Sequence, residues 1–269
     1  MTVGQAIKLG QDKIGRRDAM LLLSNATGLA SSHMMLNLDS PLSSGQSEIY
    51  NGFLQRRQCG EPTQHILGKW DFMGHEFITD SRALIPRPET ELLVQQVLEF
   101  IGGKSCQVLD LCTGSGCIGI SIALASAADV TAADISPAAI SLAMENAAKL
   151  NANINIIQSD LFSQVSGRYH AIVSNPPYIT RHEMKELDHA VLGYEPHLAL
   201  DGGEDGLDFY KKIIPQSKHH LHPGGMLFLE IGTVTDVAEL MEAEGFGGVK
   251  LLYDYAGLPR IVYGVNKNV

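Results

Sequence analysis

The sequence predicts an α/β fold, with a Rossmann-like, seven-stranded and mostly parallel sheet preceded by a small helical domain. Two observations carry this prediction. From residue 106 onward, short apolar segments of strand character alternate with segments of helical periodicity, which is typical of a parallel sheet covered by helices on both faces. Residues 1–70 instead show helical patterning and little strand signal, so they are expected to form a separate domain.

Several short helices are expected in the first domain, residues 1–70. Turn-forming segments at 25–28 and 40–45 interrupt its apolar positions and are expected to separate these helices.

A β-hairpin is expected next. The aromatic, alternating pattern of residues 70–78 around Gly74 predicts it, within a linker that spans residues 71–86. Two prolines then precede a helix that is expected to begin near Glu89. The main α/β domain is assigned to residues 87–269.

Strands and helices are expected to alternate along this main domain. The strands are expected at 106–111, 129–134, 154–158, 170–174, 226–231, 247–253 and 261–264. The helices are expected near 117–126, 137–150, 205–221 and 234–244.

The composition is that of an ordinary globular protein, with 45% hydrophobic and 19% charged residues. The formal net charge of −10 argues against a sequence-independent grip on nucleic-acid phosphates, which depends on clustered lysines and arginines. We therefore expect no direct nucleic-acid partner. A monomer without a membrane partner is a separate expectation, which the charge does not decide.

The four cysteines form no Cys-x-x-Cys pair and no secreted-type framework, so a reduced, cytoplasmic setting is expected. The N-terminus shows no signal-peptide pattern, and the longest early apolar run, residues 19–23, is far too short to cross a bilayer. His219, His220 and His222 resemble a metal tract, but they lie at an expected helix end, where imidazoles suit the helix dipole. No metal site is predicted.

Four polar segments follow expected strands and should meet at one edge of the sheet. They are the glycine loop (Cys112, Thr113, Gly114, Ser115 and Gly116), Asp134, Asp160 and Asn175. Ligands in such sheets bind at the carboxyl ends of the strands, where the strand order switches. This edge is therefore the predicted binding site.

The glycine loop is compatible with two cofactors. Residues 114–119 satisfy Gly-x-Gly-x-x-Gly, and Asp134 stands at about the spacing of a ribose-binding acid, so a nicotinamide-dependent oxidoreductase is a rival interpretation. Asp110, directly ahead of the loop, favours S-adenosylmethionine, because a carboxylate repels a pyrophosphate but attracts a methionine ammonium. An Asp110 that caps the loop amides is the alternative.

Two further acids are candidate cofactor ligands. Asp134 can accept hydrogen bonds from both ribose hydroxyls; its alternative role as a helix N-cap is better filled by Ser136, which directly precedes a proline. Asp160 can accept from the adenine amino group, with Leu161 against the ring. A turn-forming Asp160 is equally consistent with the sequence.

The segment Asn175-Pro176-Pro177-Tyr178, called the amide cradle below, has the residue types that hold a planar NH2 group. The Asn175 side-chain oxygen and the Pro176 carbonyl can accept its two N–H bonds, while Tyr178 lies against its flat face. Pro177 stiffens the turn. Asn175, Pro176 and Tyr178 are the predicted catalytic residues, and all four are predicted to bind substrate. Together with the glycine loop they indicate methyl transfer to an sp2 amino nitrogen.

A family resemblance is carried by five segments in order, from about residue 60 to Arg260. They are Gly60-Glu61-Pro62-Thr63-Gln64-His65-Ile66-Leu67-Gly68, Leu84-Ile85-Pro86-Arg87-Pro88-Glu89-Thr90-Glu91, residues 110–116, Asn175-Pro176-Pro177-Tyr178, and Asp201-Gly202-Gly203-Glu204-Asp205-Gly206-Leu207. They resemble the PrmC/HemK family, whose members are release factor glutamine methyltransferases. Pro-Arg-Pro-Glu-Thr combined with Asn-Pro-Pro-Tyr is specific, whereas Asn-Pro-Pro-Tyr alone also occurs in adenine-N6 DNA methyltransferases.

The resemblance implies a class I methyltransferase that depends on S-adenosylmethionine and releases S-adenosylhomocysteine. Its implied substrate is the glutamine of the Gly-Gly-Gln loop of bacterial class I peptide chain release factors, modified at the amide nitrogen N5. It implies cofactor contacts from residues 112–116, Asp134, Leu161 and Asn175, and substrate contacts from residues 175–178. The N-terminal helical domain carries none of these motifs, and we expect it to dock the substrate protein.

Two residues depart from the family pattern. Cys112 stands where glycine is expected, so the loop backbone there should avoid a strictly glycine conformation. Leu161 stands where some relatives carry an aromatic residue, so adenine stacking should be weaker.

Three other functions remain as alternatives. One of them, a non-catalytic cofactor-binding scaffold, would retain the fold but would not require the amide cradle. An adenine-N6 nucleic-acid methyltransferase would use the same amide cradle on a flipped base, but it should carry a basic face or a target-recognition segment. A nicotinamide-dependent oxidoreductase would explain the glycines and leave the amide cradle without a role.

Overall fold

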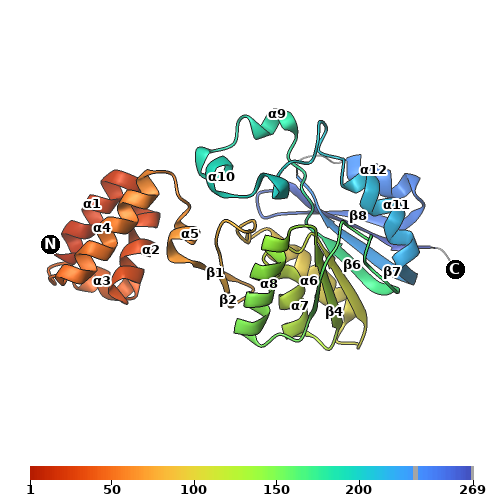
Figure 1. Cartoon of the computed structure of the whole chain (residues 1–269), viewed down its shortest axis with the longest axis horizontal. Helices are drawn as coiled ribbons and strands as arrows, with labels where there is room; N and C mark the ends of the chain where they lie inside the picture. The colour runs from red at the N-terminus through yellow and green to blue at the C-terminus, as the bar shows by residue number, and fades with distance from the viewer. Residues whose placement is uncertain (233–235, 268–269) are drawn as a thin grey trace. The chain divides into compact units, whose positions relative to one another are not determined.

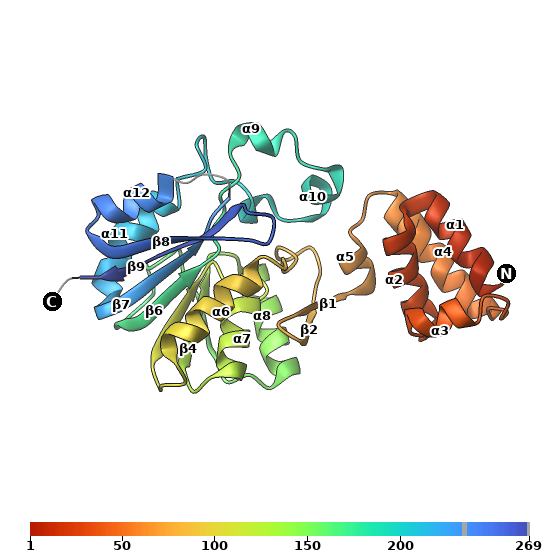
Figure 2. The same ribbon diagram turned by 180° about the vertical axis from the view of Figure 1, so that it is seen from behind.

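The computed structural model describes residues 1–232 and 236–267 and divides the chain into two compact units. The helical unit comprises Met1–Lys69 and Asp188–Tyr194, and the sheet unit comprises Trp70–Leu187 and Glu195–Val269. Figure 1 and Figure 2 show their elements from two opposite sides.

The helices of the helical unit begin and end at recognisable signals. Thr2 and Ser43 each form a capping box, with Gln5 and Gln46, and so begin α1 and α4. Gly28, at φ 72°, ends α2 in the left-handed conformation. The helices of the unit are α1 (Val3–Ile14), α2 (Arg16–Thr27), α3 (Ser31–Leu36), α4 (Ser44–Gln58), α5 (Thr63–Leu67) and α10 (His189–Tyr194).

A closed apolar core holds these helices together. Leu22, Leu23, Met34, Tyr50 and Leu54 are all buried, and they come from α2, α3 and α4. The interruptions expected at 25–28 and 40–45 are confirmed as the end of α2 and the start of α4.

The hairpin expected around Gly74 is also confirmed. Strands β1 (Lys69–Phe72) and β2 (His75–Ile78) form a two-stranded sheet. Met73 and Gly74 connect them with φ values of 51° and 74°, the left-handed pair that a two-residue hairpin turn requires.

The sheet unit is built on a seven-stranded sheet in the order β5-β4-β3-β6-β7-β9-β8. The first five strands in this order are parallel, and β9 runs antiparallel to both β7 and β8. The strands are β3 (Gln107–Leu111), β4 (Asp129–Asp134), β5 (Asn155–Gln158), β6 (Tyr169–Ser174), β7 (Leu221–Glu230), β8 (Phe246–Tyr253) and β9 (Pro259–Asn266). The predicted α/β, mostly parallel sheet of seven strands is confirmed.

Helices cover both faces of this sheet and bury a core on each (Figure 2). Apolar residues of α6, α7 and α8 belong to one core, and those of α11 and α12 belong to the other. These helices are α6 (Thr90–Ile101), α7 (Cys117–Ala125), α8 (Pro137–Leu150), α11 (Tyr210–His220) and α12 (Asp236–Ala243).

The structure corrects the helix that was expected from residue 205. Asp205 accepts a hydrogen bond from the Leu207 amide at 3.0 Å, and Gly206 has a φ of 74°, so this segment forms a turn and α11 begins only at Tyr210. Residues 234 and 235, the start of the helix expected at 234–244, lie outside the described residues.

Three short elements were not predicted: α9 (Arg181–Met184), α10 and the 3-10 turn η1 (His197–Ala199). In the sequence, all three lie between the amide cradle and α11. None of the described helices has both the length and the apolar character needed to cross a bilayer.

Candidate active site

The candidate site is a cavity at the carboxyl edge of the sheet. After β3 the chain builds β4 and β5 on one side and then returns to place β6 on the other, so the strand order switches beside β3. A cavity of about 300 Å³ opens there. Its position is the one that the parallel strands predict.

The structure brings most of the predicted site residues into the wall of this cavity. Those in the wall are Cys112, Thr113, Gly114, Ser115, Asp134, Asp160, Leu161, Asn175 and Pro177. Four predicted residues lie outside the wall: Asp110, Gly116, Pro176 and Tyr178.

Asp110 lies beneath the glycine loop. Its Oδ2 accepts from the Thr113 hydroxyl at 2.5 Å and from the Gly119 amide at 2.9 Å, and the residue is fully buried. Burial raises its pKa to about 7, although the Thr113 and Gly119 hydrogen bonds act in the opposite direction. Among the described residues its Oδ1 has no hydrogen-bond partner. These contacts make Asp110 an anchor of the loop.

Asp134 joins the glycine loop to the start of α8. Its Oδ2 accepts from the Gly114 amide and its Oδ1 from the Ser136 amide, both at 2.9 Å. Burial raises its pKa, and these amides lower it. Ser136 caps α8 by accepting from the Ala139 amide at 3.3 Å, as expected. Each Asp134 oxygen keeps a lone pair, so both can accept another donor from the cavity.

Two non-glycine residues of the wall adopt a left-handed backbone. Cys112 has a φ of 57° and Leu161 a φ of 46°. This region favours glycine and costs another residue roughly 1–2 kcal/mol. Cysteine therefore occupies position 112 in a conformation that it can reach, at a local cost. Burial also raises the pKa of the Cys112 thiol, so the sulfur stays protonated and neutral.

The amide cradle begins at the end of β6, and its first residue is fixed from two sides. The Ser174 hydroxyl donates to the Leu111 carbonyl at 2.8 Å and ties β6 to β3. Asn175 Nδ2 donates to Thr90 Oγ1, at the start of α6, at 3.4 Å. The Asn175 carboxamide therefore lies in the cavity wall with its NH2 group already engaged.

Glycines surround Tyr178, the last residue of the amide cradle. A Cβ added to Gly232 would lie 2.9 Å from the Tyr178 ring, and one added to Gly202 would lie 2.6 Å from its Cα. At Gly206, a Cβ would approach the Tyr178 carbonyl oxygen to 2.5 Å. Only glycine allows these approaches, so residues 201–206 hold the backbone of the amide cradle from outside. Burial raises the pKa of the Tyr178 hydroxyl to about 12.

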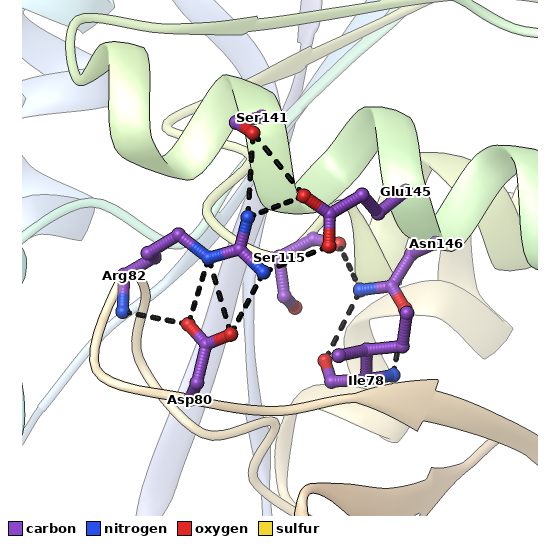
Figure 3. Close-up of polar contacts among 7 residues, drawn as sticks. All are labelled: Ile78, Asp80, Arg82, Ser115, Ser141, Glu145 and Asn146. Carbon is purple, nitrogen blue, oxygen red and sulfur yellow. Dashed lines mark hydrogen bonds and ion pairs between the residues drawn. The ribbon is translucent and has the colours of Figure 1, made fainter.

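The segment that follows β2 forms another part of the wall, and Arg82 holds it (Figure 3). Arg82 Nη2 donates to Asp80 Oδ2 and to Glu145 Oε2, both at 2.8 Å, and its Nη1 donates to Glu145 Oε1 at 2.5 Å. Because Glu145 belongs to α8, this guanidinium fixes the segment to that helix.

Asn146 ties three pieces of backbone together beside this network (Figure 3). Its Oδ1 accepts from the Ile78 amide at 2.6 Å, and its Nδ2 donates to the carbonyls of Ile78 and Ser115 at 3.2 and 3.0 Å. The hairpin, α8 and the glycine loop thus share one fully buried side chain.

Sequence reasoning missed several residues of the site. Residues 84–91 were recognised as a family motif, but no role was assigned to Thr90 or Arg87. Arg87 donates to the buried Glu195 at 2.6 Å, and the Ile85 amide donates to the same carboxylate at 3.0 Å. Glu195 and Glu230 belong to no motif, and only their positions in the fold reveal them. Within the described residues, no cluster of His, Cys, Asp or Glu is arranged to hold a metal ion.

Two family models match the chain. The PrmC N-terminal domain matches residues 8–68, and the Methyltransferase small domain matches residues 88–204. A curated relative from Geobacter sulfurreducens, named release factor glutamine methyltransferase, is 38% identical over 253 residues, which are 93% of this chain and 89% of the relative. The chain belongs to the release factor glutamine methyltransferase family.

Other members of the release factor glutamine methyltransferase family match over a similar extent. The protein from Cereibacter sphaeroides is 41% identical and covers 91% of this chain and 89% of its own length. The protein from Salmonella typhimurium is 37% identical and covers 93% of this chain and 91% of its own length.

Solved structures show the same class I methyltransferase fold at lower sequence identity. A methyltransferase from Pyrococcus furiosus is 18% identical with a TM-score of 0.55, over 71% of this chain and 89% of its own. The 16S rRNA N2 G1207 methyltransferase of T. thermophilus, solved with AdoMet and guanosine, is 19% identical with a TM-score of 0.54, over 73% of this chain and 49% of its own. The sheet unit of this family member therefore has a methyltransferase fold.

Proposed function

We propose that this protein transfers a methyl group from S-adenosylmethionine to the amide nitrogen N5 of the glutamine in the Gly-Gly-Gln loop of bacterial class I peptide chain release factors, in the cytoplasm. One observation carries the proposal. The Asn175 carboxamide, the first residue of the amide cradle, lies in the wall of the same cavity as the glycine loop and Asp134. The residue predicted to hold the nucleophile and the residues predicted to hold the cofactor thus line one cavity.

The residues of the cavity fit S-adenosylmethionine. Both Asp134 oxygens keep lone pairs for ribose hydroxyls, and the apolar Ile135 and Leu161 side chains lie in the wall for an adenine ring. The buried Ser115 hydroxyl has no partner among the described residues and can serve the methionine end. S-adenosylmethionine supplies an electrophilic methyl group on a positively charged sulfur.

The same loop is a poor site for a dinucleotide. The Gly114 amide already donates to Asp134, the Gly116 amide to the Thr113 carbonyl at 2.9 Å, and the Gly119 amide to Asp110. Amides engaged in this way are not free for a pyrophosphate. The carboxylates that engage Gly114 and Gly119 also disfavour a nearby phosphate. These contacts favour the sulfonium cofactor over NAD.

The chemistry proposed for the amide cradle depends on how it positions the substrate amide nitrogen. A glutamine amide nitrogen is a weak nucleophile, because its lone pair is delocalised into the carbonyl group. Asn175 Oδ1 and the Pro176 carbonyl oxygen accept the two N–H bonds and orient the nitrogen toward the methyl group. As positive charge develops on the nitrogen, these two hydrogen bonds strengthen in the transition state. As the N–C bond forms, the bond from the sulfonium sulfur to the methyl carbon would break and S-adenosylhomocysteine would leave. The nitrogen would then lose one proton to water.

The helical unit is proposed to dock the release factor. None of the residues of this unit whose side chains are described belongs to the wall of the cavity, and a family model named for the PrmC N-terminal domain matches residues 8–68. A folded protein substrate needs contacts beyond one glutamine, and a compact helical unit offers a surface for them.

Mass spectrometry tests the proposed substrate. The protein is incubated with S-adenosylmethionine and, in parallel reactions, with an intact class I release factor or with duplex DNA. We expect the release factor peptide that contains the Gly-Gly-Gln loop to gain the mass of one methylene group, and the DNA to stay unchanged. Methylated DNA adenine with an unmodified glutamine would overturn the proposal in favour of a nucleic-acid methyltransferase.

A further inference from the structure

Glu230 is a buried carboxylate that the fold does not account for. It ends β7, it is 2% exposed, and among the described residues no donor reaches its Oε2 atom. The positive charge of Arg260 lowers the pKa of Glu230, but the Arg260 guanidinium donates its hydrogen bond to Asp254 Oδ2, at 2.8 Å. A buried acceptor in this state costs free energy and therefore requires an explanation.

Thr90 connects this carboxylate to the amide cradle. Asn175 Nδ2 donates to Thr90 Oγ1 at 3.4 Å, and Thr90 and Asn175 are among the groups that lower the pKa of the Glu230 carboxyl. Thr90 is only 2% exposed, yet it forms part of the cavity wall. The three side chains come from β7, α6 and the end of β6, so their meeting depends on the fold.

The direction of these hydrogen bonds follows from the donors and acceptors. An ionised carboxylate only accepts, so the Thr90 hydroxyl donates its single proton to Glu230 and accepts from Asn175 with a lone pair. Only the NH2 end of the Asn175 carboxamide can then face Thr90 and Glu230. Oδ1 is left as the end that is free to accept.

We propose that Glu230 is a positioning residue of the amide cradle: acting through Thr90, it fixes the Asn175 carboxamide with Nδ2 turned inward and Oδ1 presented to a substrate NH2 group. The inference rests on the proposed function for the identity of that substrate. It explains why the oxygen of the Asn175 carboxamide, and not its NH2 group, faces the substrate. An asparagine side chain has no intrinsic preference between these two nearly isosteric orientations.

The protonation state of Glu230 should control this orientation. Burial is the main cause that raises its pKa to about 7, and the negative charge of Glu89 acts in the same direction. Thr90, Arg260 and Asn175 lower the pKa but do not offset the effect of burial. A protonated Glu230 can donate to Thr90, whose hydroxyl can then turn toward Asn175 and bond Oδ1 instead. The titratable groups that act on Glu230, or on which it acts, are Arg260, Glu89, Tyr178, Tyr210 and Cys117.

Nuclear magnetic resonance tests the inference without a substrate. The Asn175 side-chain NH2 signal is assigned by its absence in Asn175→Ala and followed against pH in the full-length protein. We expect the signal to shift with a midpoint near pH 7. The shift should vanish in Glu230→Gln. A signal that does not move with pH, or that moves equally in Glu230→Gln, would overturn the inference.

Thr90 provides a matched pair of variants should Glu230→Gln fail to fold. Thr90→Val keeps the shape of the side chain and removes its hydroxyl, whereas Thr90→Ser keeps the hydroxyl. We expect the pH-dependent shift of the Asn175 signal to be lost in Thr90→Val and kept in Thr90→Ser. The same behaviour in both variants would show that Thr90 does not connect Glu230 to Asn175, and would contradict the inference.

Kinetics on a release factor separates this inference from the proposed function. We expect kcat to fall about tenfold in Glu230→Gln and in Thr90→Val, the equivalent of one hydrogen bond, and to recover in Thr90→Ser. The wild-type kcat/KM should decline as pH falls through about 7, and this limb should be absent in Glu230→Gln. If the wild type methylates the release factor and the pH profile of kcat/KM is the same in Glu230→Gln, the inference is contradicted and the proposed function is not. If the Asn175 signal shifts with pH as expected but the wild type methylates no release factor, the proposed function is contradicted and the inference is not.

Discussion

In the helical unit, acidic side chains lie near the surface beside arginines. Arg57 Nε contacts Asp18 Oδ2 at 2.7 Å, and the Arg56 guanidinium lowers the pKa of the Glu61 carboxyl. At the carboxyl ends of β3, β4 and β7 in the sheet unit, no hydrogen bond from an arginine of the described residues holds the acidic side chain. Backbone amides and the Thr113 hydroxyl hold Asp110 and Asp134, no donor of the described residues reaches Glu230 Oε2, and burial raises the pKa of all three carboxyls.

The difference is between exposed carboxylates that form ion pairs on the surface and carboxylates that lie beside a binding cavity. An exposed ion pair is worth about 0–1 kcal/mol and can be replaced with little consequence. A buried carboxylate without a cationic partner opposes folding, so it persists where a function requires it. The comparison therefore supports the proposal that cofactor and substrate chemistry belong to the sheet unit and that the helical unit docks the substrate protein.

The largest effect is expected from removing the helical unit. A chain that begins near Asp71 should still bind S-adenosylmethionine, because every residue of the cavity wall lies in the sheet unit. Its activity on an intact release factor should fall by more than about 100-fold, the equivalent of roughly 3 kcal/mol of docking free energy. Calorimetry and methyl-transfer assays measure the two quantities. Full activity of the shortened chain would remove the docking role.

The next largest effect is expected in the amide cradle. Asn175→Ala removes one acceptor that strengthens in the transition state, at a cost of about 2–3 kcal/mol, so turnover should fall roughly 30- to 150-fold. Asn155→Ala, at the exposed amino end of β5, is the matched control and should leave turnover unchanged. Near-normal methylation by a folded Asn175→Ala protein would exclude the cradle mechanism.

A somewhat smaller effect is expected on cofactor affinity. Asp134→Ala removes two charged acceptors, each worth about 1.5–3 kcal/mol before water compensates, so S-adenosylmethionine should bind about 10- to 100-fold more weakly. Asp129→Ala changes an exposed aspartate at the amino end of the same strand and is the control. Equal affinities of these two variants in calorimetry would show that Asp134 does not hold the ribose.

The smallest effect is a difference in the pH dependence of folding. The Glu230 pKa is raised from 4.5 to about 7 in the folded state, so this carboxyl favours folding most at low pH and its contribution is lost as pH rises toward 7. Each unit of pKa is worth about 1.4 kcal/mol, so Glu230→Gln should gain stability relative to wild type by on the order of 2 kcal/mol between about pH 5.5 and pH 7.5.

Glu61→Gln in the helical unit should behave in the opposite way. Its pKa is lowered in the folded state, so its contribution to stability is present above its ordinary pKa and is lost as pH falls. Chemical denaturation of both variants at several pH values gives the two trends. Trends of the same sign would contradict the contrast between the two regions.

Local patterns predicted the strands and the longer helices of the sheet unit, but not α9, η1 or the start of α11. Alternating apolar segments predicted every strand of the sheet, and the Ser136-Pro137 start of α8 was predicted from capping chemistry alone. The glycine loop, Asp134 and Asn175 were predicted to meet because parallel strands share one carboxyl edge, and the cavity wall contains Asp134, Asn175 and four of the five loop residues.

The partners of these residues could not be predicted in the same way. Thr90 and Glu230 stand 140 residues apart in the numbering, and no local pattern indicates that both act on Asn175. Asp110 was expected to meet the methionine ammonium, and the alternative, an anchor of the loop, matches its contacts with Thr113 and Gly119. Such contacts depend on packing between distant segments, which sequence periodicity does not encode.

Replacing one glutamine of the substrate tests the assignment of function most directly. An intact class I release factor and its variant with alanine in place of the Gly-Gly-Gln glutamine are each incubated with this protein and S-adenosylmethionine carrying a radiolabelled methyl group. We expect one methyl group per wild-type factor and background incorporation into the variant. Equal incorporation into both factors would place the methyl group on another residue and contradict the proposed function.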